Sequence, residues 1–399
     1  MPEPFMDSPK ARPHDALTAV RDLGPLLAAH GEEIERQREL PPAVVEALLQ
    51  RDLFRLLVPR EIGGAEVSPL TLIEVIEAVA MHDASTAWCI GQNAVSGMLA
   101  VFLDPDPARE VFGVPTGIVA WGPPSSGEAR TVDGGYLLTG KFNFASGSRH
   151  APWLGAHVPV VDRDGSTQKD AGGTPVVHTL LFPKAEAQVT DTWHVMGLKG
   201  TGSDSYAVNN VFVPSRFAVR RDAETKPWSS GTLYCFGPSS LYAASFAGVA
   251  LGIARSALDA FIETARDKVP RGAKRALRDH NFIQFQVGHA EARLRSARAF
   301  LMGAYDQAWR HAASGSAIGT EQNIALRLAT TWAIREASAV VAAIYDAAGA
   351  TAIFTSNPFE RRFRDIHTVT QQIQGHRANF EAVGQVLLGT HPERRMFTF

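Results

Sequence analysis

The chain has 399 residues, of which 45% are hydrophobic and 20% are charged, and its formal net charge is −2 at pH 7. A single hydrophobic core stops growing at roughly 250–300 residues, so we expect two or three subdomains. The 39 Lys and Arg residues nearly balance the 41 Asp and Glu residues, which excludes a globally basic nucleic-acid-binding protein. Two cysteines, Cys89 and Cys235, exclude a disulfide scaffold.

Targeting and membrane signals are the next features to consider. Residues 1–15 lack the apolar core of a signal peptide. The longest apolar stretches, such as Tyr242–Ile253, fall short of the roughly 20 residues needed to cross a bilayer. We therefore predict a cytoplasmic protein with no membrane partner and no nucleic-acid partner.

The first part of the chain, residues 1–116, is predicted to be a helical domain. Apolar residues recur at helical spacing between positions 44 and 57. Ser68 and Pro69 form a typical helix start, because serine caps the free backbone N–H groups and proline fits the first helical position. The run from Leu103 to Pro107 ends the pattern.

The middle part, residues 117–226, is predicted to be a β domain. Alternating patterns and turn residues replace helical spacing, with a hairpin turn at Val132–Tyr136. We expect Gly165–Thr174 to be its most mobile loop. Gly197–Gly202 is rich in glycine but has the wrong spacing for a dinucleotide fingerprint, which favours a tight turn between strands.

The last part, residues 227–399, is predicted to be a helical bundle. Long helical patterns cover 241–269, 281–314 and 321–348, and a final helix is expected near 377–388. The fold class is therefore α+β, mostly α, in the order helices, sheet, helices. The sequence has no G-x-S-x-G elbow, no phosphate-binding loop and no paired C-x-x-C, so we expect no dedicated metal site.

Two segments of the β domain carry a family resemblance. Gly140–Trp153 resembles the flavin-contacting segment of the acyl-CoA dehydrogenase superfamily. Met196–Ser203, followed by Val208–Pro214, resembles the M-G-x-[RK]-G-[ST] turn and the strand after it in the same family. The resemblance covers almost the whole chain. It implies an N-terminal helical domain, a central β domain and a C-terminal four-helix bundle.

The resemblance also implies a flavin site. Phe144 stands at the aromatic position that packs near the isoalloxazine ring, and Ser146 stands at the hydroxyl position near flavin N5. The full set of flavin-binding residues that we expect is Trp121, Phe144, Ser146, Gly147, Thr201 and Ser203.

The chain departs from the family where the dehydrogenases carry their catalytic base. Removal of the α-proton of a thioester needs a carboxylate. The usual Y-E-G segment is absent, because no Glu lies between Glu360 and Glu381, and Tyr242 stands at the alternative base position. A flavin-dependent dehydrogenase or desaturase that acts on a non-CoA substrate through another base remains the alternative.

The branch that keeps the fold without this base is that of the two-component flavin-dependent monooxygenases. Ala145-Ser146-Gly147 and the R-D-x-H element at Arg364–His367 are similar to this branch. The resemblance implies an oxygenase that takes reduced FMN or FAD from a separate flavin reductase. It would use O2 to hydroxylate an aromatic, indolic or polycyclic small molecule through a flavin C4a-hydroperoxide, as a homotetramer. The implied catalytic residues are Ser146, His367 and Gln372, where Gln372 stands in place of a frequent histidine.

Substrate contacts are expected from the helices. The candidates are Asn93, Tyr242 and Phe246, with Phe236 and Phe282 as further aromatic residues. Packing in the core is the alternative for Asn93 and Trp121, and a structural histidine is the alternative for His367. The basic run Arg361–Arg364 would either contact a flavin phosphate or form a solvated face. A binding protein that keeps the fold without catalysis is a third functional class.

Overall fold

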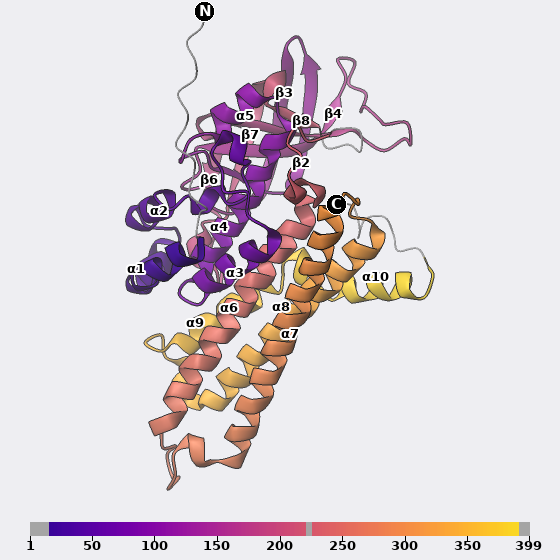
Figure 1. Cartoon of the computed structure of the whole chain (residues 1–399). Coiled ribbons are helices and arrows are strands. Elements are labelled where there is room, and N and C mark those ends of the chain that lie inside the picture. Colours follow the sequence, from indigo (N-terminus) through magenta and orange to yellow (C-terminus); the bar gives the residue numbers. More distant parts are fainter. Residues whose placement is uncertain (1–15, 221–225, 391–399) are drawn as a thin grey trace, which may run out of the picture.

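The protein folds in the expected order of helices, sheet and helices (Figure 1). The computed structural model describes residues 16–220 and 226–390. Residues 1–15, on which the targeting prediction depends, lie outside the described residues. The domain boundaries expected at 116 and 226 stay predictions, and the second borders the undescribed residues 221–225.

The helices and strands have the following bounds. The N-terminal helices are α1 Ala16–Gln37, α2 Pro42–Leu49, α3 Pro69–Ala80, α4 Ala84–Gly97 and α5 Pro105–Phe112. The strands are β1 Val119–Trp121, β2 Pro124–Val132, β3 Gly135–Ala145, β4 Trp153–Val161, β5 Val177–Pro183, β6 Gln188–Thr190, β7 Asp204–Pro214 and β8 Ala218–Arg220. The C-terminal helices are α6 Pro238–Asp267, α7 Asn281–Ala313, α8 Thr320–Ala348, α9 Pro358–Val369 and α10 Ala378–Leu387.

Side-chain caps define the start of the two central N-terminal helices. Ser68 Oγ accepts a hydrogen bond from the Thr71 backbone N–H at 3.2 Å, which confirms the predicted start of α3. Asp83 Oδ1 accepts from the Thr86 N–H at 2.6 Å and caps α4. Every residue of α4 is buried, so this helix runs through the interior between the sheet and the bundle.

The described strands form one mixed sheet with the order β6-β7-β3-β2-β4-β5-β8, and β1 pairs with β4. The predicted turn after Val132 joins β2 to β3 as a hairpin. The pairing of β3 with β7 is irregular between Phe142 and Ala145, and Phe144 has φ +61° there. A non-glycine residue rarely adopts this left-handed conformation, so the end of β3 bends at Phe144.

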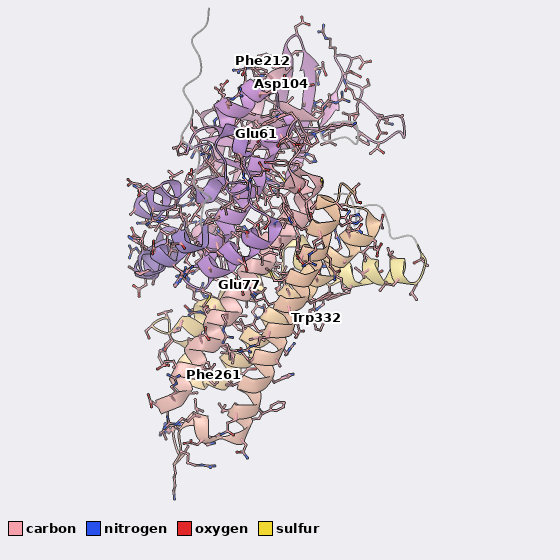
Figure 2. The ribbon with its side chains drawn as sticks, viewed as in Figure 1. Glu61, Glu77, Asp104, Phe212, Phe261 and Trp332 are labelled. Atoms are coloured by element: carbon pink, nitrogen blue, oxygen red, sulfur yellow. The ribbon has the colours of Figure 1, made fainter. Side chains whose placement is uncertain are left out.

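The C-terminal helices form the elongated part of the molecule, in which α6, α7 and α8 run side by side (Figure 1). Their bounds confirm the predicted helices to within three residues. The structure adds α9, which the sequence analysis did not predict. Helix α3 packs along α6, and Arg298 Nε on α7 donates to both carboxylate oxygens of Glu77 on α3 at 3.0 and 2.8 Å (Figure 2).

Two features bear on the remaining fold predictions. Two helices are long and apolar enough to cross a membrane by length and composition, but 89% of the apolar window of α6 is buried inside the fold, as in a core helix. The loop Gly165–Thr174 is held by its own hydrogen bonds, since Asp170 Oδ1 accepts from the Gly172 and Thr174 N–H groups at 2.8 and 2.9 Å.

Candidate active site

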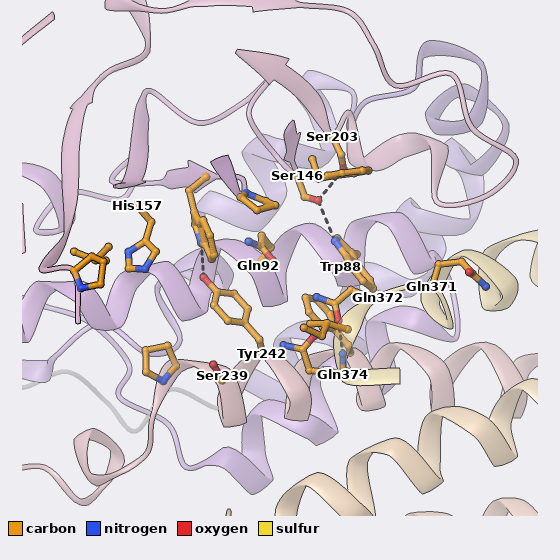
Figure 3. Close-up of a pocket in the computed structure, with 18 of the residues that line it drawn as sticks. Trp88, Gln92, Ser146, His157, Ser203, Ser239, Tyr242, Gln371, Gln372 and Gln374 are labelled. Atoms are coloured by element: carbon orange, nitrogen blue, oxygen red, sulfur yellow. Dashed lines mark hydrogen bonds between the residues drawn. The ribbon is translucent and has the colours of Figure 1, made fainter. Parts of the chain in front are cut away.

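A cavity of about 1560 Å³ lies where α4, the sheet and the start of α6 meet (Figure 3). The segment that follows α9 closes one end of it. Six lining residues show which elements contribute: Trp88 and Gln92 from α4, Ser146 and Thr201 from the sheet side, Tyr242 from α6 and Gln372 after α9. The cavity is thus built from all three parts of the chain, as a site at subdomain boundaries commonly is.

A chain of hydroxyl groups lies on the sheet side of the cavity. Ser146 Oγ lies 2.7 Å from Ser203 Oγ, and Ser203 Oγ lies 2.7 Å from Thr201 Oγ1. Thr201 Oγ1 donates to the Leu198 carbonyl at 2.9 Å, and Trp88 Nε1 donates to Ser146 Oγ at 3.1 Å (Figure 3). All three hydroxyl residues are at least 95% buried, because their relative exposures are 5%, 2% and 2%.

The direction of this chain follows from counting protons. A hydroxyl group donates one hydrogen bond. Thr201 gives its proton to the Leu198 carbonyl, so Ser203 must donate to Thr201 and Ser146 must donate to Ser203. Ser146 Oγ also accepts from Trp88. The remaining lone pair makes Ser146 a hydrogen-bond acceptor toward the cavity.

The turn that carries Thr201 is fixed by the C-terminal bundle. Leu198 has φ +51°, and its N–H donates to Asp365 Oδ1 on α9 at 2.6 Å. Gly200 lies so close to α1 that a Cβ atom there would come within 2.1 Å of Ile34 Cγ2. The glycine-rich segment is therefore a tight turn, as predicted, and its glycine allows close packing of the turn against α1.

Asp365 belongs to a buried ion cluster. Arg361 pairs with Asp83, which caps α4, and lies 3.7 Å from both Glu35 Oε1 and Asp365 Oδ2. Burial raises the pKa of Asp365 to about 6 despite the opposing charge of Arg361. The other arginines of the basic run also bond within the protein, Arg362 to Ser256 Oγ at 2.6 Å and Arg364 to Glu360 and Glu35 at 2.7 and 2.8 Å, so the run is not a solvated face.

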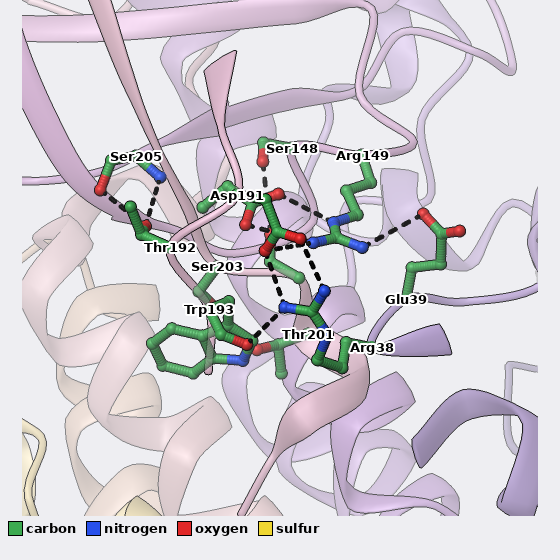
Figure 4. Close-up of polar contacts among 12 residues, drawn as sticks. Arg38, Glu39, Ser148, Arg149, Asp191, Thr192, Trp193, Thr201, Ser203 and Ser205 are labelled. Atoms are coloured by element: carbon green, nitrogen blue, oxygen red, sulfur yellow. Dashed lines mark hydrogen bonds and ion pairs between the residues drawn. The ribbon is translucent and has the colours of Figure 1, made fainter. Parts of the chain in front are cut away.

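A second ion network supports the same turn from the outside (Figure 4). Arg149 Nε donates to Asp204 Oδ2 at 2.8 Å, next to Ser203 at the start of β7. Arg38 donates to Asp191 at 2.6 Å and to the Trp193 carbonyl at 3.1 Å. The arginine partners, Arg38 first, lower the pKa of Asp191 to about 2, so this network keeps its charges at neutral pH.

Aromatic rings form the helical wall of the cavity. Trp88 stacks on Phe246 with the ring centroids 3.9 Å apart, and Phe246 lies 6.0 Å from Tyr242. Trp121 Nε1 donates to the Tyr242 hydroxyl at 2.6 Å. Phe144 is 61% exposed and meets the ring of Trp193 edge-on at 6.2 Å. These rings could enclose a planar ligand between the sheet and α6.

Most of the predicted site residues line this one cavity. They are Trp121, Phe144, Ser146, Thr201, Ser203, Tyr242, Phe246 and Gln372. Asn93 and Gly147 lie one layer behind. Asn93 Nδ2 donates to the Val119 carbonyl at 3.2 Å, and Asn93 Oδ1 would lie 2.6 Å from a Cβ at Gly147. These contacts agree with the alternative that Asn93 packs in the core, and not with a direct contact to the substrate.

His367 also lies outside the residues that line the cavity. Its ring packs against Phe363 at 4.3 Å, and its buried Nε2 has no hydrogen-bond partner in the described part of the chain. Two of the aromatic residues expected near the substrate lie elsewhere. Phe236 is buried against Trp309 at 6.1 Å, and Phe282 is 65% exposed on α7.

Trp88 and Gln92 on α4 are lining residues that the sequence analysis missed. Gln92 follows Trp88 by four residues, and residues four apart lie on one face of a helix. Asn93 points to another face because each helical residue turns the chain by about 100°. Spacing from Trp88 could have selected Gln92. Within residues 16–220 and 226–390, no group of three or more His, Cys, Asp or Glu residues is placed to hold a metal ion.

Comparison with known proteins agrees with this site. Residues 20–106 match the family model of the acyl-CoA dehydrogenase N-terminal domain, and residues 244–376 match that of the C-terminal domain. Together with the fold and the hydroxyl-lined cavity, these matches define the class. The chain belongs to the acyl-CoA dehydrogenase superfamily, in the branch of the flavin-dependent monooxygenases.

Three relatives illustrate the branch. Indole-3-acetate monooxygenase from Pseudomonas putida is 32% identical, over 94% of this chain and 93% of its own. The FADH2-dependent resorcinol hydroxylase oxygenase component from Rhizobium sp. is 28% identical, over 98% of both chains. The structure of XiaF from Streptomyces sp. with FADH2 and glycerol is similar with a TM-score of 0.87 and 25% identity, over 95% of this chain and 96% of that chain.

Proposed function

We propose that the chain is the oxygenase component of a two-component flavin-dependent monooxygenase. Reduced FMN or FAD would come from a separate flavin reductase, and the substrate would be an aromatic, indolic or polycyclic small molecule. We also propose a cytoplasmic homotetramer. Exposed aromatic residues on α7 and α8, such as Phe285 at 64% and Trp332 at 40%, are compatible with further subunit contacts.

The observation that carries the proposal is that a hydroxyl acceptor faces a helical wall without a carboxylate. Ser146 presents a lone pair, which suits the N5–H group of a reduced flavin. Among the described residues that line the cavity, the carboxylates are Asp162 and Asp170, both from the segment between β4 and β5. The helical wall has none, so the dehydrogenase alternative lacks its proton acceptor there.

The residues fit a flavin, and we assign them the following roles. Phe144, Ser146, Thr201 and Ser203 would hold the ring, and Trp121, Tyr242 and Phe246 would shape the substrate chamber. Gln372 would offer an amide hydrogen bond at the far end, with Asn93, Gly147 and His367 as supporting residues. When bound, reduced flavin supplies the two electrons with which O2 converts a ring C–H into C–OH and water.

Within this arrangement the protein's own groups perform three tasks. Ser146 Oγ accepts a hydrogen bond from an N–H group of the bound ligand and so keeps that group in place, because the Ser146 proton is already donated to Ser203. The aromatic wall excludes water, which protects a reactive oxygen species from premature loss. The ion clusters on α9 and around Arg149 keep the turn at Thr201 in place.

The test uses the purified full chain. It is mixed without oxygen with reduced FMN or FADH2 and a panel of aromatic compounds, and isotopically labelled O2 is then added. Incorporation of one labelled oxygen atom into a product, in proportion to flavin oxidised, is the expected result. Flavin oxidation with release of H2O2 alone across a broad panel would contradict the proposal.

A further inference from the structure

The side-chain amide of Gln92 faces the cavity of the candidate active site and makes no hydrogen bond to the described part of the protein. Gln92 is only 8% exposed, and it lines the cavity on the face of α4 that also carries Trp88 (Figure 3). The Gln92 backbone carbonyl accepts from Ser96 Oγ at 3.1 Å, but the side-chain amide makes no hydrogen bond within the described part of the chain. The amide is therefore open to the cavity, where a ligand can take the place of water as its hydrogen-bond partner.

The neighbouring polar groups on this wall are already engaged. Ser96 gives its proton to the Gln92 carbonyl, so the Tyr242 hydroxyl donates to Ser96 Oγ, which lies 3.4 Å away. The same hydroxyl accepts from Trp121 Nε1. The Tyr242 proton and the Trp121 N–H are therefore spent inside the protein. Gln92 remains the group of α4 that is available to a molecule held between the aromatic rings.

The surroundings of Gln92 are neutral. The charged residues that line the cavity are Asp162, Lys169, Asp170 and Arg220, and all four come from the sheet side. His150, which bonds Asn93 Oδ1 on α4 at 3.1 Å, lies behind the cavity wall, and burial lowers its pKa to about 3. Among the described residues, neither α4 nor α6 contributes a carboxylate or a histidine to the cavity lining, and His157, Asp162 and Asp170 line it from the sheet side.

We propose that Gln92 Oε1 recognises a neutral N–H or O–H group carried by the aromatic ring of the substrate. This inference rests on the proposed function and names the substrate class for the same cavity. An amide oxygen accepts a hydrogen bond without removing the proton, so the ligand stays neutral. A ring N–H or a ring hydroxyl group also donates a lone pair to the aromatic system, and the resulting electron-rich ring suits oxygen transfer to carbon. The recognition is selective because a bound ligand without the donor displaces water from the amide and leaves its oxygen unpaired.

The experiment compares two matched pairs of probes. Indole is compared with 1-methylindole, and phenol is compared with anisole, by calorimetric binding to the full chain before and after addition of reduced FMN without oxygen. We expect the donor-bearing member of at least one pair to bind ~10-fold more tightly than its methylated partner. The pair that shows the difference identifies the donor as N–H or O–H.

Two variants assign the effect to the amide. Gln92→Leu should bind both members of the selected pair with affinities that agree within about 2-fold. Gln50→Leu, at an exposed glutamine that directly follows α2, is the matched control and should keep the wild-type difference. Equal binding of both members of each pair by the wild-type chain would overturn the inference, whatever the variants do. A difference that persists in Gln92→Leu would also overturn it.

Failure of this inference differs from failure of the proposed function. If labelled oxygen enters an aromatic product while the probe pairs bind equally, the monooxygenase function stands and the role of Gln92 falls. If H2O2 alone forms with every compound while the probe pairs are discriminated, Gln92 recognises the donor but the proposed reaction falls.

Discussion

The direction of the hydroxyl chain predicts how the protein discriminates between the two redox states of a flavin. A reduced flavin carries N5–H, which donates, whereas oxidised flavin N5 only accepts. Ser146 faces the cavity as an acceptor because Thr201 commits its proton to the Leu198 carbonyl and so orders the whole chain. We expect Thr201→Val, which removes the hydroxyl group at nearly constant size, to release Ser146 from this role.

The magnitude follows from the hydrogen bond that would be left unmade. In the wild-type protein, binding of oxidised flavin places two acceptors opposite each other, and a buried unsatisfied polar group costs ~1–3 kcal/mol. In the variant, Ser203 can donate to Ser146, and Ser146 can then donate to flavin N5. The ratio of the oxidised to the reduced dissociation constant should therefore fall by roughly 5- to 150-fold.

The assay measures both dissociation constants by flavin fluorescence and absorbance, without oxygen, for wild type and Thr201→Val. Thr192→Val is the matched control, because Thr192 is exposed and bonds Ser205 at 2.9 Å outside the cavity. The control should keep the wild-type ratio. The reasoning is refuted if Thr201→Val weakens the binding of oxidised and reduced flavin equally. The Thr201 hydroxyl would then support the turn without setting the direction of the hydrogen bonds in the hydroxyl chain.

Three further predictions concern the groups around the cavity. Asp365→Asn should gain stability relative to wild type as the pH rises from 4 to 8. The folded pKa of Asp365, about 6, exceeds the unfolded value of 3.8, so the wild-type free energy of unfolding falls by up to ~3 kcal/mol across that window. Unfolding in denaturant at each pH measures this, and a constant difference between the two proteins would contradict it. Tyr242→Phe should raise the KM for the aromatic substrate by roughly 5-fold in steady-state kinetics, because Trp121 Nε1 loses its acceptor, and an unchanged KM would argue against a role for this pair. Gly200→Ala should destabilise the fold by ~1–3 kcal/mol and weaken flavin binding, because its Cβ would meet Ile34 at 2.1 Å. Thermal unfolding and flavin titration measure the two effects. Wild-type values in both would show that α1 can shift to accommodate the Cβ atom at little cost.

The sequence by itself determined the features that depend on neighbouring residues. The start of α3 at Ser68 and Pro69, the hairpin after Val132 and the tight turn at Gly197–Gly202 are all set by local backbone chemistry. The order of helices, sheet and helices was also evident, because hydrophobic spacing changes along the chain. The motif around Ser146 indicated the flavin site since its residues are contiguous.

Only the tertiary structure decided which side chains face the cavity and which charges are internal. Asn93 and Gln92 are adjacent in sequence, but the packing of α4 against the sheet turns Gln92 into the cavity and Asn93 toward the Val119 carbonyl. Helix α9 escaped prediction because Arg361 and Asp365 face inward, where Arg361 pairs with both Asp365 and Asp83, a residue 278 positions earlier in the chain. Such pairings depend on how distant elements pack, which no local pattern records.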